Sequence, residues 1–140
     1  MTPILIILAE FVGFFGIDVS KQVVHFRPAA EIPHVIDDPI RGKRKADAYC
    51  EYSTKHIIVN LDHWKTINKW QKKELIFHEL GHCVCGLWHI QGEDIMNPFS
   101  PTGYQVKSDG SNWRKMVTKM VKRCKPGKSS IGGLKASEAS

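Results

Sequence analysis

The chain has 140 residues, of which 42% are hydrophobic and 9% aromatic, a composition that suits one folded domain with its own core. This length leaves no room for two catalytic domains. The formal net charge of +6 could attract nucleic acid, anionic lipid or acidic proteins. Runs of like charge are more often solvated surfaces, and no nucleic-acid-binding motif accompanies them here, so we expect nucleic acid to be an unlikely partner, reached only through the basic C-terminal tail.

Residues 3–16 are almost entirely apolar and allow two interpretations. As a secretory signal, the stretch lacks a basic start and a small-residue cleavage site, and it carries Glu10 inside its apolar run. It is also shorter than a membrane span requires. As a helix, it has Thr2 as N-cap, Pro3 as first helical residue and Gly16 beyond its end. We favour a buried helix packed against the sheet over a signal or an anchor.

Strand patterns follow this segment. Residues 23–27 predict a strand that ends at Pro28. Residues 28–45 contain three prolines, two adjacent aspartates and a basic run, which are typical of a surface loop. Residues 46–52 and 56–61 predict two strands that a short turn joins as a hairpin.

Helical spacing dominates the second half of the chain. Residues 66–85 predict a helix with one packed and one solvated face, and residues 112–123 predict a final helix, with a loop at 99–110 between them. The folded domain is predicted to span residues 1–125. The remaining residues, 126–140, form a basic, Gly/Ser-rich tail that we expect to be disordered unless a partner holds it.

A histidine-rich motif, HELGHCVCGLWH, begins at His78. His78 and His82 are four residues apart, so on a helix they share one face and can bind one metal ion, with Glu79 able to reach a water on that ion. His89 follows His78 by eleven positions and would lie about 16 Å further along an unbroken helix. The helix must therefore end before His89, and Gly86 can adopt the left-handed conformation that turns the chain back.

This motif, followed by Met96 in the sequence Ile-Met-Asn-Pro, resembles the metzincin clan of zinc metallopeptidases, most closely its matrixin branch. The family pattern is H-E-x-x-H-x-x-G-x-x-H, followed by a turn whose methionine lies beneath the metal. One extra residue precedes Gly86 here, and Cys85 occupies the family's glycine position. The resemblance extends over roughly residues 46 to 99, and the motif carries its specificity.

The resemblance implies an α+β zincin-like domain with a mixed sheet, a backing N-terminal helix, an active-site helix and a C-terminal helix. It implies a Zn2+ cofactor held by His78, His82 and His89. Glu79 would be the catalytic base for attack of an activated water on a peptide bond. The strand at 46–52 would be the sheet edge that holds an extended peptide or protein substrate.

The same resemblance places the wall of the substrate's S1′ pocket in the segment after the methionine turn, at residues 99–104. Tyr104 itself is too distant in sequence from the motif to be assigned a role.

Two other functions remain open from the sequence. The chain could be a zincin-fold structural subunit of a larger assembly, such as a phage particle, in which zinc mainly stabilises the fold. It could also be a DNA-associated protease resembling the SprT-like group, as the basic tail suggests. Glu79 favours a peptidase over a structural zinc site, because zinc binding alone does not need this carboxylate.

The four cysteines permit two disulfides, but Cys83 and Cys85 lie two residues apart in a predicted helix, a poor geometry for bridging each other. We therefore expect packed thiols. That expectation favours a cytoplasmic or virion-associated protein over a secreted one.

Overall fold

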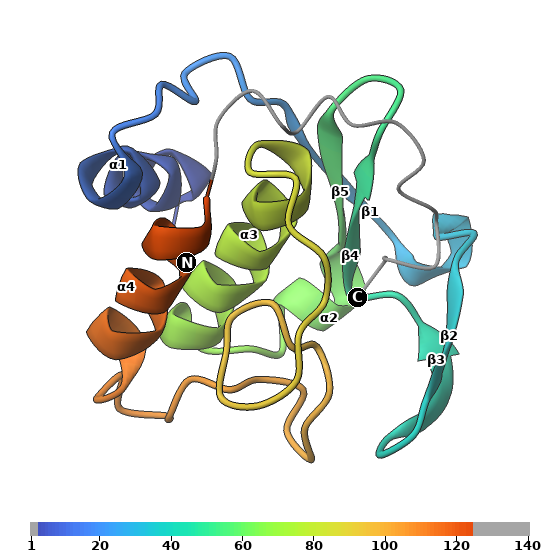
Figure 1. Ribbon diagram of the computed structural model, residues 1–140. Coiled ribbons are helices and arrows are strands. Elements are labelled where there is room, and N and C mark those ends of the chain that lie inside the picture. Colours follow the sequence, from blue (N-terminus) through green and yellow to red (C-terminus); the bar gives the residue numbers. More distant parts are fainter. Residues whose placement is uncertain (1–2, 125–140) are drawn as a thin grey trace.

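A mixed three-stranded sheet, in the order β1–β5–β4, lies on one side of the domain, and the helices lie on the other (Figure 1). The computed structural model describes residues 3–124. β5 pairs with one parallel and one antiparallel neighbour, so β4 is an edge of this sheet. The strands are β1 (Val24–Arg27), β4 (Ala48–Glu51) and β5 (His56–Asn60). The predicted α+β class and the predicted β4–β5 hairpin are confirmed.

A second, two-stranded sheet lies where the sequence predicted a surface loop, so that prediction was wrong. Its strands, β2 (Val35–Asp38) and β3 (Gly42–Lys45), pair antiparallel. Asp38 explains the hairpin, because its buried carboxylate accepts hydrogen bonds from the guanidinium groups of Arg41 and Arg44. Charged contacts hold these strands together, so they lack the apolar alternation by which strands are recognised in a sequence.

The described residues contain four α-helices and one short 3-10 turn. They are α1 (Ile4–Phe15), α2 (Leu61–Trp64), α3 (Lys69–Cys83), α4 (Trp113–Arg123) and η1 (Ala29–Glu31). Within residues 3–124, none of the helices combines the length and apolar character needed to cross a membrane.

The N-terminal helix α1 ends at Gly16 as predicted, with a left-handed φ of 67° at that residue. Pro3 is its N-cap rather than its first helical residue, and the predicted cap Thr2 lies outside the described residues. The helix packs chiefly on α3 and α4, not against the sheet, burying Ile7 and Phe11 against them (Figure 1). The predicted helix is therefore present, but its predicted packing partner was wrong.

The central helix α3 begins later than the sequence prediction of residue 66, because Asn68 caps it. The Asn68 side chain accepts a hydrogen bond from the Gln71 backbone, and the Gln71 side chain accepts one from the Asn68 backbone. This capping box fixes the start of the helix. The preceding short helix α2 includes Leu61, which the sequence had placed in a strand.

The final helix α4 matches its predicted range closely. It buries the predicted apolar face in the core that it shares with α1 and α3, where Trp113 contacts Phe77, and Val121 lies half-buried at the margin. The fully or nearly fully buried residues of this face are Trp113, Met116, Val117 and Met120. The predicted tail at 126–140 lies outside the described residues.

All four cysteines form disulfides, so the prediction of packed thiols was wrong. Cys83 and Cys85 do not bridge each other; instead, each pairs with a distant partner. Cys50 of β4 bridges Cys83 at the end of α3, and Cys85 bridges Cys124 at the end of α4. Spacing along the sequence could not reveal these partners, because the fold brings them together from 33 and 39 residues apart.

We predict that replacing Cys85 and Cys124 together by serine lowers the free energy of unfolding by about 2–4 kcal/mol, since the unfolded chain gains loop entropy. Denaturant unfolding of the variant and the parent protein measures this loss. The matched variant lacks Cys50 and Cys83 and should lose a similar amount. Titration of four reactive thiols in the folded parent protein would contradict both disulfides.

Candidate metal centre

The helix α3 ends where the sequence requires it to end, between the second and third histidines of the motif. Its last residue is Cys83, and Gly86 adopts a left-handed φ of 65° three residues later. The Leu87 backbone N–H then donates to the Gly81 carbonyl at 2.8 Å, which folds the chain back along the helix end. The extra residue before Gly86 is accommodated in this turn.

The structure brings together the three histidines that the sequence singled out. One ring nitrogen from each of His78, His82 and His89 lies within 4.8 Å of the others. The Nε2 atom of His78 is 3.2 Å from that of His82 and 3.2 Å from that of His89. Ligand nitrogens of a tetrahedral zinc ion, at about 2.0–2.1 Å from the metal, lie about 3.3 Å apart. The cluster could therefore hold a metal ion, and its spacing fits zinc.

Backbone carbonyls determine which nitrogens face the centre of the cluster. Nδ1 of His78 donates to the Ile95 carbonyl at 2.7 Å, and Nδ1 of His82 donates to the Leu87 carbonyl at 2.8 Å. In a neutral imidazole only one nitrogen carries a proton, so both Nε2 atoms present lone pairs. Two such atoms 3.2 Å apart have no proton to share between them. This arrangement suits a cation at the centre of the cluster, because backbone carbonyls orient metal-binding histidines in the same way.

Burial keeps these imidazoles neutral. Burial, together with the neighbouring His82 and His89, holds the pKa of His78 well below its usual value of 6.5. Burial first, and then His89, lowers the pKa of His82 to about 3. A proton is therefore a poor occupant of the cluster near neutral pH, whereas neutral imidazole is the form that binds a metal.

The turn at residues 94–98 contacts the helix that carries the first two histidines, since its Ile95 carbonyl accepts the hydrogen bond from His78. Met96 is fully buried, and its backbone N–H is held by the Asp94 carboxylate at 2.9 Å. Arg123 of α4 forms a bidentate pair with the same carboxylate, with both distances at 2.8 Å. A Cβ atom at Gly81 would lie 2.4 Å from the Met96 sulfur. The methionine can therefore reach the helix only because Gly81 has no side chain.

Glu79 directly follows His78 on α3 and is fully buried. This is the residue that the sequence predicted as the catalytic base.

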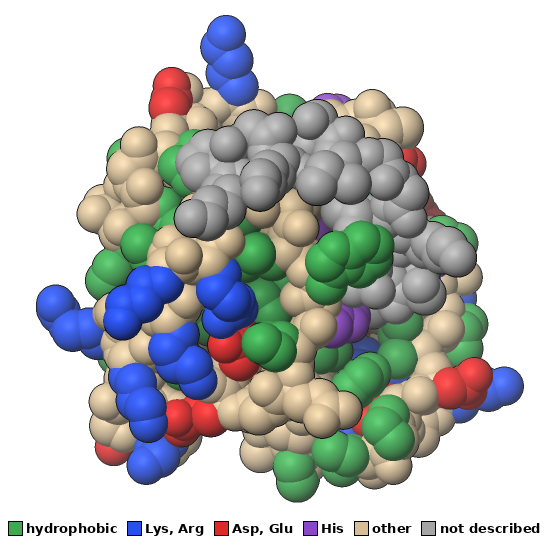
Figure 2. Space-filling view, viewed as in Figure 1, with side chains coloured by type: hydrophobic (Ala, Val, Ile, Leu, Met, Phe, Trp, Pro, Cys, Tyr) green, Lys and Arg blue, Asp and Glu red, His purple; other side chains and the backbone are tan. Residues whose placement is uncertain are grey.

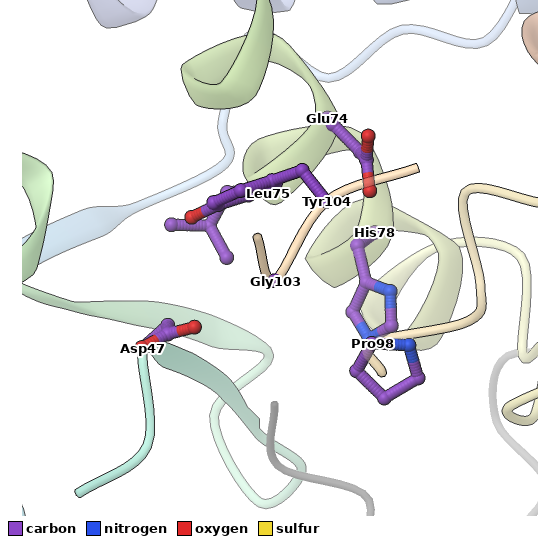
Figure 3. Close-up of a pocket in the computed structure, with 7 residues that line it drawn as sticks. All are labelled: Asp47, Glu74, Leu75, His78, Pro98, Gly103 and Tyr104. Carbon is purple, nitrogen blue, oxygen red and sulfur yellow. The ribbon is translucent and has the colours of Figure 1, made fainter. Parts of the chain in front are cut away.

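A small pocket adjoins His78 (Figure 3). Its lining residues come from the position just before β4, from α3, and from the methionine turn and the loop after it. They are Asp47, Glu74, Leu75, His78, Pro98, Gly103 and Tyr104. The Tyr104 ring forms part of the wall, and its hydroxyl points away from His78 (Figure 3). That hydroxyl is hydrogen-bonded to Nε2 of His63 at 2.5 Å. Tyr104, which the sequence could not assign, therefore shapes the pocket and does not face the histidine cluster.

Sequence reasoning missed Glu74, which holds the pocket loop on α3. Its carboxylate accepts hydrogen bonds from the backbone N–H groups of Gln105 and Val106. Burial raises the pKa of this carboxyl to about 8, against the opposing effect of those two N–H groups. Its place on the buried face of α3, one turn before His78, was the only signal in the sequence.

Asp47 links the pocket to the β2–β3 hairpin. It accepts from Arg41 and Arg44, each at 3.2 Å, and lies 3.5 Å from Nδ1 of His63. The Arg41 guanidinium packs over Gly103, where a Cβ atom would lie 2.8 Å away. The unexpected hairpin therefore supports the pocket wall.

Fold and site together define a small mixed α+β protein with a three-histidine candidate metal centre. Comparison with models of protein families, with curated proteins and with solved structures finds no match to this chain.

We predict that Gly81→Ala displaces Met96 and lowers the free energy of unfolding by about 1–3 kcal/mol, because the added methyl group overpacks the site. Metal affinity should fall with it, because Gly81 directly precedes His82 on α3 and Met96 directly follows Ile95, whose carbonyl orients His78. Calorimetric unfolding and zinc titration measure the two effects. The control is Gly13→Ala in α1, where nothing lies within 4 Å, so helix propensity should stabilise this variant slightly. Equal behaviour of the two variants would contradict the close approach of Met96.

We predict that the metal-free protein loses stability as the pH falls from about 6.5 to about 3. Between the unfolded pKa of 6.5 and the folded pKa of about 3, the unfolded His82 binds a proton that the folded one excludes, so acid favours unfolding. Each such histidine contributes up to about 1.4 kcal/mol per pH unit. Denaturant unfolding at several pH values, in chelator, should show a shallower slope for His82→Gln. An unchanged slope in this variant would contradict the low pKa.

Proposed function

We propose that this chain is a zinc-dependent endopeptidase with a zincin-like fold, resembling the matrixins. The observation that carries the proposal is the facing pair of lone pairs at the centre of the histidine cluster. Nε2 of His78 and of His82 lie 3.2 Å apart while both Nδ1 atoms donate to carbonyls. His89 adds a third nitrogen at the same distance from His78.

The donor set favours zinc among the common metals. Three neutral imidazoles are typical ligands of catalytic zinc, which keeps one coordination position open, whereas a structural zinc site usually has four protein ligands. Among the described residues, the only group of three or more metal-binding side chains is His78, His82 and His89. A fourth protein ligand is therefore missing from this part of the chain, as a catalytic centre requires.

Glu79 is the residue we propose as base. When bound, zinc supplies a Lewis acid that acidifies a water molecule and polarises the scissile carbonyl. Glu79 would accept the proton of the attacking water and deliver it to the leaving amine. Its position directly after His78 on α3 supports this role.

The edge strand β4 supports a peptide as substrate. One side of β4 pairs with β5, and the strand is joined to the end of α3 by the Cys50–Cys83 disulfide. An extended peptide could add to the other side of β4 through backbone hydrogen bonds. The pocket beside His78 would then receive one substrate side chain.

We predict that Glu79→Gln lowers kcat/KM for peptide hydrolysis at least about 100-fold while zinc binding is retained, because the variant lacks the base but keeps the three ligands. His82→Ala should lose both zinc and activity. Metal analysis and cleavage of a peptide library measure both properties. The matched control is Glu31→Gln, which makes the same carboxylate-to-carboxamide replacement at an exposed residue of η1 and should leave activity unchanged.

Full cleavage by Glu79→Gln would exclude this residue as the base. A zinc-loaded parent protein that cleaves no peptide in the library would favour the structural-subunit function instead. Salt-dependent DNA binding would favour the DNA-associated protease.

A further inference from the structure

The outer face of α1 is apolar, although it faces solvent. Leu5 is 78% exposed, Ile6 52% and Val12 38%. The only charged residue of the helix, Glu10, is paired with Lys73 of α3 at 2.8 Å. A surface helix normally turns polar residues outward. We name this exposed face the α1 stripe, formed by Leu5, Ile6, Ala9 and Val12.

The α1 stripe borders a groove. Leu5, Leu8, Ala9 and Val12 of α1 line it together with residues 18–20. The stripe and groove together present mainly aliphatic side chains, with Asp18 and Ser20 as the polar residues of the lining. Such a surface can bury apolar groups, but it has little means of selecting a polar partner.

Basic side chains lie on the helix next to the stripe. α4 packs against α1 and carries five arginines and lysines with no acidic residue. Figure 2 shows Lys and Arg side chains gathered over the position of α4. Lys115, Lys119 and Arg123 are bonded to residues 93 and 94. Arg114 and Lys122 are exposed and form no ion pair within residues 3–124.

A second basic group lies at the groove. Lys21 and Lys55 line a hollow that shares Asp18 and Val19 with the groove. Two lysines therefore lie at this hollow beside the single carboxylate of Asp18, in addition to the cations of α4.

An apolar stripe with basic side chains beside it favours some binding partners over others. A second copy of the chain would bring together two molecules of net charge +6, and their like charges would oppose association. An anionic bilayer instead offers acidic headgroups to the cations and acyl chains to the aliphatic residues. We propose that the α1 stripe docks this protein on the surface of an anionic lipid bilayer, with α1 lying in the interface. This docking is independent of the zinc site.

The test is co-sedimentation of the full chain with vesicles of phosphatidylcholine alone or with about 30% phosphatidylglycerol. The parent protein should bind the acidic vesicles, and salt should weaken binding. Leu5→Gln with Ile6→Gln should reduce the partition coefficient at least tenfold. The matched control is Val35→Gln with Ile40→Gln, residues that are 53% and 51% exposed on the β2–β3 hairpin. Arg114→Glu with Lys122→Glu should reduce binding to acidic vesicles and leave any binding to neutral vesicles unchanged.

The proposal is overturned if the parent protein binds neither vesicle, or if the α1 and hairpin variants bind equally. A concentration-dependent dimer that Leu5→Gln with Ile6→Gln abolishes would also overturn it, by identifying a second copy as the occupant. Circular dichroism should show that each variant is folded. Peptidase activity is not needed for any of these measurements, so their failure and the failure of the proposed function are distinguishable.

Discussion

The close approach of two unprotonated imidazole nitrogens is the constraint on which the site depends. His78 and His82 each give their one ring proton to a backbone carbonyl, and their lone pairs meet at 3.2 Å. The two carbonyls, of Leu87 and Ile95, lie on either side of His89 in the sequence. The same hydrogen bonds that orient the helix histidines therefore also fix the ends of the loop that carries the third one. A metal ion would complete an arrangement that the backbone has already prepared, which lowers the cost of ordering the ligands.

The rest of the fold holds that loop and the end of α3. Two disulfides meet within three residues, at Cys83 and Cys85, and tie the helix end to β4 and to α4. Gly81 allows Met96 to pack closely against α3, and Arg123 holds Asp94 at the start of the same turn. A domain of this size has a limited core. Covalent links at the end of α3, where the chain turns back, are therefore an effective source of stability. Disulfides persist in oxidising compartments, so they remove the reason for expecting a reduced environment.

A charged network supports the pocket in a similar way. Asp38 and Asp47 are both buried, and each contacts both Arg41 and Arg44. Buried ion pairs contribute little net stability, because desolvation offsets the attraction, but they penalise arrangements that leave a charge unpaired. This network therefore specifies where the β2–β3 hairpin sits more than how stable it is. Through His63, it also reaches the pocket wall.

Some of this protein could be read from the order of its residues. Local rules were sufficient for the four-residue spacing of His78 and His82, the left-handed turn at Gly86, the β4–β5 hairpin and the apolar face of α4, because each depends on neighbours in the chain. The Asn68 capping box was also visible locally, although the prediction overlooked it.

Only the tertiary structure decided the disulfide partners, the β2–β3 hairpin and the packing of α1 on helices rather than on the sheet. These features depend on groups that are distant in sequence, such as Cys50 with Cys83 or Arg41 with Gly103, and no local pattern encodes such a distance. The protonation state of the histidine cluster is likewise decided only by the tertiary structure. It is determined by two carbonyls and by burial, both of which arise only when the chain is folded.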